Sequence, residues 1–256
     1  GRRHLGARTT ECRLVTITGY YGAMKHERYR RLVYDWDATL IDSNERIVAS
    51  LQHASREVVG VDLDASRARS VIGLGLHEAL ERLHPELGAV DIASVADAYR
   101  QNFLYDSDVP ERLFDGVVDM LQQLSAENYT LAIATGKSRP GLDRAMEHHE
   151  LGHYFVTTRC AGEYRSKPDP EMLNSILHEL GTPAKDTVMI GDSEHDMLMA
   201  GNAGVDAIGV SQGVQDAESL LSHHPLACLD DITDLYDFLS HNTRNSFNNR
   251  NLVNND

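Results

Sequence analysis

The sequence predicts an α/β protein in which helices flank a parallel sheet and a helical insertion follows the first strand. Three observations lead to this fold class. A short apolar run at residues 32–34 ends in two closely spaced aspartates. Residues 43–105 then show only amphipathic helical patterns. From residue 117 onwards, strand and helix patterns alternate, as is typical of α/β proteins.

The first strand is the apolar run Leu32-Val33-Tyr34, which precedes Asp35-Trp36-Asp37. A continuous apolar run is typical of a strand that is buried on both faces of a parallel sheet. Pleating sends neighbouring side chains to opposite faces only while the strand lasts. Because the chain leaves the strand here, both carboxylates can face one cavity at the strand's carboxyl end.

A helical insertion follows, because residues 43 to about 105 show no convincing strand pattern. Apolar residues recur at helical spacing in four stretches, Ser43 to Val59, Ala65 to Ile72, Leu76 to Leu83 and Asp91 to Tyr105. Gly73-Leu74-Gly75 lacks the third glycine and the preceding strand of a dinucleotide-binding motif, so we interpret it as a loop.

The remaining chain alternates regularly after the turn signal Asp115-Gly116. Further strands are predicted at Tyr129 to Ala134, Tyr154 to Thr157, Thr187 to Ile190, Asp206 to Val210 and Ala227 to Leu229. Helices are predicted at Val117 to Leu124, Arg139 to His149, Pro170 to Leu180, Glu194 to Asn202 and Ile232 to Leu239. This pattern predicts a Rossmann-like parallel sheet, in which ligands bind outside the carboxyl ends of the strands.

The predicted core therefore consists of residues 29–42 and 112–240, interrupted by the all-helical insertion at residues 43–111. Residues 1–28 are expected to form an extension ahead of the fold. Residues 241–256 are rich in asparagine and poor in apolar residues, so a disordered tail is expected there.

Composition limits the possible partners. With 41% hydrophobic and 25% charged residues, the chain has the composition of a soluble globular protein. A formal net charge of −15 repels polyanions, so nucleic acid is not expected as a partner. No apolar stretch approaches the roughly 20 residues of a membrane helix, so no membrane is expected either. The widely spaced Cys12, Cys160 and Cys228 favour a reducing cytoplasm.

The paired aspartates suggest a two-step displacement on phosphorus. Asp35 would attack as the nucleophile and form an aspartyl phosphate, which divides one difficult displacement into two easier steps. Asp37 would protonate the leaving oxygen and then activate water. Because an acidic protein holds a small anion only where the potential is reversed locally, we expect a divalent cation at the site.

The other polar residues after the strands are then donors to the phosphate, since phosphoryl transfer spreads charge over three equatorial oxygens. The hydroxyl of Thr135 and the backbone N–H of Gly136 would bind the phosphate. Lys167 would screen the nucleophile and the phosphoryl oxygens from each other.

The expected metal ligands are the Asp35 carboxylate, the Asp37 main-chain carbonyl and Asp192, an all-oxygen set suited to Mg²⁺. Asp196 is expected to accept a hydrogen bond from a donor or a metal-bound water, with a structural salt bridge as the alternative. Thr39 is expected to support the site in the same way.

Four ordered motifs carry a family resemblance. They are Asp35-Trp36-Asp37-Ala38-Thr39-Leu40, Thr135-Gly136, Lys167-Pro168-Asp169-Pro170 and Gly191-Asp192-Ser193-Glu194-His195-Asp196. The chain thus resembles the haloacid dehalogenase superfamily over about Arg31 to Leu239. The flanking Ile41-Asp42-Ser43 and Ala200 to Gly204 are similar to the phosphoglycolate phosphatase-like branch, whose helical cap is inserted right after the first motif. The resemblance implies Mg²⁺ dependence and a mobile cap.

One departure is Ala38, where the family usually has glycine. If this residue needs a positive φ, alanine costs about 1 kcal/mol. Activity would then be reduced but not abolished.

The function expected from these observations is hydrolysis of a small phosphorylated metabolite, similar to phosphoglycolate or a sugar phosphate, through an aspartyl-phosphate intermediate. A phosphomutase of the same fold would share the nucleophile, the acid/base and the cap. A noncatalytic regulatory module is the third possibility, and the complete set of Asp35, Asp37, Lys167 and Asp192 argues against it. The residue pattern carries no signal for the oligomeric state.

Overall fold

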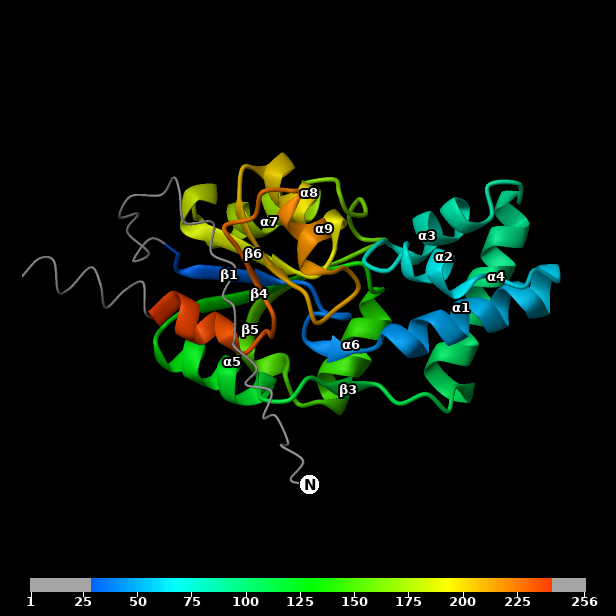
Figure 1. Ribbon diagram of the computed structural model, residues 1–256, viewed down its shortest axis with the longest axis horizontal. Coiled ribbons are helices and arrows are strands. Elements are labelled where there is room, and N and C mark those ends of the chain that lie inside the picture. Colours follow the sequence, from blue (N-terminus) through cyan, green and yellow to red (C-terminus); the bar gives the residue numbers. More distant parts are fainter. Residues whose placement is uncertain (1–28, 241–256) are drawn as a thin grey trace, which may run out of the picture.

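The computed structural model describes residues 29–240 of the chain (Figure 1). The predicted extension at residues 1–28 and the predicted disordered tail at residues 241–256 lie outside the described residues. Within the described part, no helix combines the length and the apolar character needed to cross a membrane.

Six strands within residues 29–240 form one sheet in the order β5-β4-β1-β6-β7-β8, and all neighbouring pairs are parallel. The strands are β1 (Arg31–Tyr34), β4 (Thr130–Thr135), β5 (Phe155–Cys160), β6 (Thr187–Gly191), β7 (Asp206–Val210) and β8 (Ala227–Leu229). The predicted parallel sheet is therefore confirmed. β1 lies between β4 and β6, where the strand order reverses, which is the position at which such sheets bind ligands.

Helices cover both faces of the sheet (Figure 1). One face carries α5 (Val117–Ala126), α6 (Arg139–His148) and a helix over 234–240, and the other carries α7 (Glu171–Leu180), α8 (Glu194–Ala203) and α9 (Ala217–Leu221). Leu32 and Tyr34 of β1 pack in the first apolar cluster, whereas Val33 packs in the second. Burial on both faces explains why β1 is a continuous apolar run.

An all-helical unit leaves the core after β1 and lies beside the carboxyl end of the sheet, on the right of Figure 1. It consists of α1 (Asn44–Val59), α2 (Ala65–Arg69), α3 (Leu76–Leu83), α4 (Ala89–Gln101) and a π-helical turn, η2 (Asn102–Asp106). This unit, which we call the cap, has its own apolar cluster that includes Leu51, Leu80, Val95 and Phe103. The predicted helical insertion is confirmed, and its limits at residues 43 and 111 stay a prediction.

Two very short strands join the cap to the core. β2 (Ile41–Asp42) and β3 (Arg112–Leu113) pair antiparallel, so the chain enters and leaves the cap side by side. Arg46 reinforces this junction, because its guanidinium donates to the carbonyls of Phe103 (2.8 Å) and Val109 (2.7 Å). Sequence patterning did not predict these strands, since two residues cannot display a period.

Several predicted boundaries were wrong. α2 ends at Arg69, and Val71 and Ile72 lie in the following turn, although both are buried. Both side chains are apolar because the turn packs against the interior of the cap, and not because the helix continues. β5 runs on to Cys160, three residues further than predicted. α9 and the short 3₁₀ turns η3 (Gly152–Tyr154) and η4 (Ala184–Asp186) were not predicted.

Candidate active site

The predicted site residues converge at the carboxyl edge of the sheet. Asp35 follows β1, Thr135 is the last residue of β4, and Asp192 follows β6. The register of β1 with both neighbours brings these three strand ends to one edge. The structure therefore brings together side chains that are up to about 157 residues apart in sequence, as expected for parallel strands.

Asp35 has one carboxylate oxygen held and one free of partners. Its Oδ1 accepts from the backbone N–H of Trp36 (2.7 Å) and contacts Lys167 Nζ at 2.8 Å. Its Oδ2 is buried and accepts no hydrogen bond from any residue in 29–240. A buried polar oxygen without a partner is rare, so each one calls for an explanation. A fixed carboxylate with one free oxygen is the arrangement that a nucleophile requires.

Lys167 bridges two acidic side chains. Its ammonium contacts Asp35 at 2.8 Å and Asp196 Oδ1 at 2.7 Å, and its side chain is fully buried. Burial alone lowers the pKa of Lys167, but the Asp196 and Asp35 carboxylates outweigh burial and raise that pKa above its usual value. Lys167 is therefore a fixed positive charge beside the Asp35 carboxylate.

Asp196 is held from both sides. Its Oδ2 accepts from the Ser193 backbone N–H (3.2 Å) and hydroxyl (2.6 Å) at the start of α8, while Oδ1 pairs with Lys167. A side chain added at Gly191 would place its Cβ 2.3 Å from the Asp196 carboxyl carbon. Glycine at the end of β6 thus lets Asp196 reach Lys167. The salt bridge that was the alternative interpretation of Asp196 is present.

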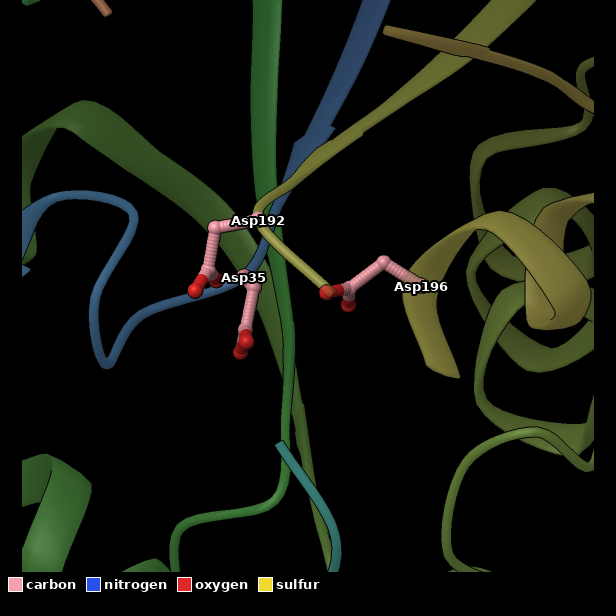
Figure 2. A group of neighbouring side chains, drawn as sticks. All are labelled: Asp35, Asp192 and Asp196. Atoms are coloured by element: carbon pink, nitrogen blue, oxygen red, sulfur yellow. The ribbon is translucent and has the colours of Figure 1, made fainter. Parts of the chain in front are cut away.

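Three carboxylates gather at this point, as Figure 2 shows for Asp35, Asp192 and Asp196. One oxygen from each lies within 4.8 Å of the others, and all three residues are buried. Asp192 is oriented by hydrogen bonds from Thr39 Oγ1 to its Oδ1 (2.9 Å) and from the Val214 N–H to its Oδ2 (2.8 Å). Thr39 therefore lies where a residue that supports the site was expected.

The cluster carries more negative charge than its surroundings balance. Burial raises the pKa of Asp35 to about 7 even though Lys167 lowers it. Burial, together with repulsion from Asp196 and Asp35, raises the pKa of Asp192 well above its usual value. With all three carboxylates ionised, the four side chains that include the Lys167 ammonium carry two net negative charges, and the raised pKa values are the sign of this imbalance. An all-oxygen set with this charge fits a hard divalent cation such as Mg²⁺.

Asp37 also lies in the site, but its carboxylate is not one of the three in this cluster. It accepts from the Ser43 hydroxyl (2.9 Å) and from Lys137 Nζ (2.8 Å), and Lys137 contacts Glu111 at 3.4 Å. The Asp37 side chain keeps 12% of its surface exposed, so it remains accessible.

Sequence reasoning assigned no role to Ser43, Lys137 or Glu111. Lys137 directly follows Thr135-Gly136 at the end of a strand, and this position was the available signal. Glu111 lies in the segment returning from the cap, where no pattern marks it.

Ala38 has φ 62°, so the position does need the left-handed conformation that glycine adopts without strain. The backbone N–H of Ala38 donates to the Ile41 carbonyl at 2.7 Å, which closes the turn between the two aspartates and β2. The expected cost of alanine here, about 1 kcal/mol, therefore applies.

The loop Gly73-Leu74-Gly75 of the cap touches the core beside Thr135 and Gly136. The Gly75 N–H donates to Ser166 Oγ (2.6 Å), and an added Cβ at Gly136 would lie 2.4 Å from the Leu74 carbonyl oxygen. The backbone of the cap loop is therefore in close contact with the backbone of the core at Gly136, whose N–H is expected to bind the phosphate. This contact places the cap over the predicted phosphate site.

The substitution Gly136→Ala is expected to lower kcat/KM by about 100-fold, because backbone at Leu74 cannot yield to a methyl group and a displacement near 1 Å costs about that much. Steady-state kinetics would measure the loss. Gly201→Ala is the matched control, since a Cβ at that helical position meets nothing within 4 Å. Near wild-type kcat/KM in Gly136→Ala would show that this close contact is not needed for turnover.

Comparisons with known proteins show the family and the fold. The family model of the haloacid dehalogenase-like hydrolases matches residues 32–210. "Probable phosphatase IndB" of Dickeya dadantii (strain 3937) is 31% identical over 210 residues, which cover 80% of this chain and 90% of that protein. Pyrophosphatase PpaX of Bacillus velezensis is 28% identical over 213 residues, covering 83% and 97%. The crystal structure of a predicted phosphoglycolate phosphatase from Haemophilus somnus has the same fold, with a TM-score of 0.73 at 20% identity over 82% and 98% of the two chains.

Proposed function

This chain belongs to the haloacid dehalogenase-like hydrolases, and we propose that it is a magnesium-dependent phosphatase that hydrolyses a small phosphomonoester through a phosphorylated Asp35. Hydrolysis of a P–O bond in a phosphorylated compound is the part supported by its relatives, which include a protein named as a probable phosphatase and one named as a pyrophosphatase. The observation that carries the proposal is the buried Oδ2 of Asp35, which has no hydrogen-bond partner within residues 29–240, in a residue that lines the same cavity as Asp37.

In the first step, Asp35 Oδ2 attacks phosphorus while Oδ1 stays bound to the Trp36 N–H and Lys167. The new bond joins Asp35 to the phosphoryl group, and the bond from phosphorus to the substrate's alcohol oxygen breaks. Asp37 gives that oxygen its proton, so the product leaves as a neutral alcohol.

In the second step, the same carboxylate accepts a proton from water as the water attacks the phosphorylated Asp35. Inorganic phosphate leaves, and both aspartates return to their initial state. Hydrogen bonds from Ser43 and Lys137 fix the Asp37 side chain, which supports its use in both steps.

During both steps, neutral hydrogen-bond donors and the Lys167 ammonium would bind the phosphoryl oxygens. Thr135 and Gly136 lie at the end of β4, beside the end of β1 that carries Asp35. The Thr135 hydroxyl oxygen accepts from the Lys137 N–H at 3.1 Å, which leaves its own hydrogen free to donate to phosphate. Lys167 separates the charge of Asp35 from that of the phosphoryl oxygens.

Asp35, the main-chain carbonyl of Asp37 and Asp192 are the proposed Mg²⁺ ligands. When bound, Mg²⁺ would neutralise charge on the phosphoryl oxygens and on these carboxylates. Asp196 belongs to the same cluster, but its Oδ1 is paired with the Lys167 ammonium, whereas within residues 29–240 the oxygens of Asp192 accept only from neutral donors. We therefore assign Asp196 to orienting Lys167.

A phosphomutase would share these residues, but the two relatives compared at sequence level are named for hydrolysis. Phosphoglycolate and sugar phosphates remain the substrates that the family resemblance implies.

The metal proposal predicts that EDTA abolishes hydrolysis of p-nitrophenyl phosphate and that added Mg²⁺ restores it. Asp192→Asn should raise the Mg²⁺ concentration for half-maximal activity by more than about tenfold, since it replaces a charged ligand by a neutral one. A thermal melt supplies a second measurement, because Mg²⁺ should raise the melting temperature of the wild type more than that of the variant.

Asp216→Asn is the control for this experiment. Asp216 caps α9 at the surface, and asparagine caps a helix equally well. Full activity in EDTA, or an Mg²⁺ requirement of Asp192→Asn equal to that of the control, would contradict the proposed metal site.

A further inference from the structure

One cavity joins the catalytic aspartates to the interior of the cap. Asp35, Asp37 and Gly136 line its core side, and the centres of water-sized molecules can occupy about 100 Å³ of it. Since one water needs roughly 10–15 Å³ by this measure, the cavity has room for a small organic group. A phosphate on Asp35 would therefore have its ester group directed into this space.

The cap walls of the cavity are apolar. They are formed by α1, by the turn and loop between α2 and α3, by α3, and by α4 with its π-helical end. The apolar residues include Leu51, Ile72, Ala79, Tyr99, Phe103 and Leu104. The rings of Tyr99 and Phe103 stack with their centroids 5.6 Å apart, which gives one wall a flat aromatic surface. Such a surface favours a flat or flexible apolar ligand.

Positive charge in the cavity is already committed to protein carboxylates. Among the residues that line it within the described chain, Lys137 and Arg100 are basic. Lys137 contacts Asp37 and Glu111, and its ammonium lies 4.7 Å from the centre of the Phe103 ring. Arg100 pairs with Asp97 at 2.7 Å and is half-exposed to solvent. A second anionic group on the substrate would have to break one of these pairs or stay unpaired against apolar walls.

We propose that the preferred substrate is a phosphomonoester whose alcohol portion is uncharged and largely apolar, with an alkyl or aromatic group held inside the cap. The inference rests on the proposed phosphatase function and narrows its substrate class. Carboxylate-bearing and pyrophosphate substrates bring a second anion to a cavity whose basic lining residues within 29–240, Lys137 and Arg100, already pair with carboxylates. Sugar phosphates bring several hydroxyl groups to walls with few hydrogen-bonding partners.

Ethyl, butyl and hexyl phosphate test this inference, because the three alcohols are nearly equal as leaving groups and differ only in apolar length. With Mg²⁺ present, kcat/KM should rise about fourfold for each methylene that becomes buried. Hexyl phosphate should also be hydrolysed with higher kcat/KM than phosphoglycolate, glucose 6-phosphate or pyrophosphate. A flat alkyl series, or preference for one of the three polar substrates, would overturn the inference.

Two cap variants connect the selectivity to the cavity. Ala79→Leu should remove the advantage of hexyl over ethyl phosphate because it fills the space beside α3. Leu104→Lys should shift the ratio of kcat/KM values from butyl phosphate toward phosphoglycolate by at least about tenfold, since it supplies a cation. Val90→Lys is the matched control, because Val90 is 79% exposed on the cap surface. Equal ratios in Leu104→Lys and Val90→Lys would contradict the proposed location.

Binding separates failure of this inference from failure of the proposed function. Isothermal titration of Asp35→Asn with the same alkyl phosphates needs no turnover. The dissociation constant should fall from ethyl to hexyl phosphate if the cavity holds the alkyl group. A chain-length-independent constant, or no binding of any alkyl phosphate, would overturn the substrate class. Absence of wild-type hydrolysis for every ester tested would instead overturn the proposed phosphatase activity.

Discussion

Replacing Asp35 by asparagine is expected to lower kcat by at least about 1000-fold while the protein stays folded. The amide keeps the shape of the side chain but lacks the charged Oδ2 that would attack phosphorus. The amide oxygen can still accept from the Trp36 N–H and Lys167, as Oδ1 of Asp35 does. Removal of one buried carboxylate also relieves the repulsion that contributes to the raised pKa of Asp192.

Steady-state hydrolysis of p-nitrophenyl phosphate measures the loss, and circular dichroism with a thermal melt checks the fold. Asp216→Asn is the matched control, since it makes the same chemical change at the exposed N-cap of α9. It should retain wild-type turnover. If Asp35→Asn kept more than about a tenth of wild-type kcat, Asp35 would not be the nucleophile.

The fold was predictable where residue patterns depend on burial. β1 and β6 were recognisable as strands because both faces of the sheet are covered, so that each contains a run of three apolar residues. The helices of the cap were predicted because each has one apolar face. Some predicted boundaries were wrong because a residue can be buried without being helical. Val71 and Ile72 are examples, since both are buried in a turn. β2 and β3 were missed because each has only two residues, which is too few to display a period.

The part of the site that is formed by strand ends could be predicted together with the sheet. Asp35, Thr135 and Asp192 end or follow parallel strands, and parallel strands carry such residues to one edge. The contact of Lys137 with Asp37 and Glu111 could not be predicted in this way. It depends on the path of the segment that leaves the cap, in which Glu111 directly precedes β3. The cavity could not be predicted either. The apolar residues that form its walls have the same sequence pattern as residues packed in the core of the cap, so the pattern does not distinguish the two.

Replacing Asp37 by alanine is expected to have the second large effect, and this effect should depend on the leaving group. Asp35 would still attack p-nitrophenyl phosphate, because p-nitrophenolate leaves without needing a proton. The phosphorylated Asp35 should then accumulate, since no base remains to activate water. Alkyl phosphates should hardly react, because an alkoxide leaves only with protonation.

Rapid-quench mass spectrometry would detect the adduct as a phosphate-sized mass increase on the peptide that holds Asp35. The wild type should show little adduct, and the double variant Asp35→Asn with Asp37→Ala should show none. In Asp37→Ala, Lys137 keeps Glu111 as a partner, so loss of the fold is not expected. Asp37→Asn, which preserves the side-chain shape between Ser43 and Lys137, provides a second variant of the same test.

Two results would contradict these roles in different ways. If Asp37→Ala hydrolysed alkyl phosphates at the wild-type rate, the carboxylate held by Ser43 and Lys137 would be a structural part of the loop after β1. If no adduct formed with p-nitrophenyl phosphate although product appeared, water would attack phosphorus directly. In that second case, the free Oδ2 of Asp35 would serve only to bind metal, and the large loss expected for Asp35→Asn would reflect loss of metal binding.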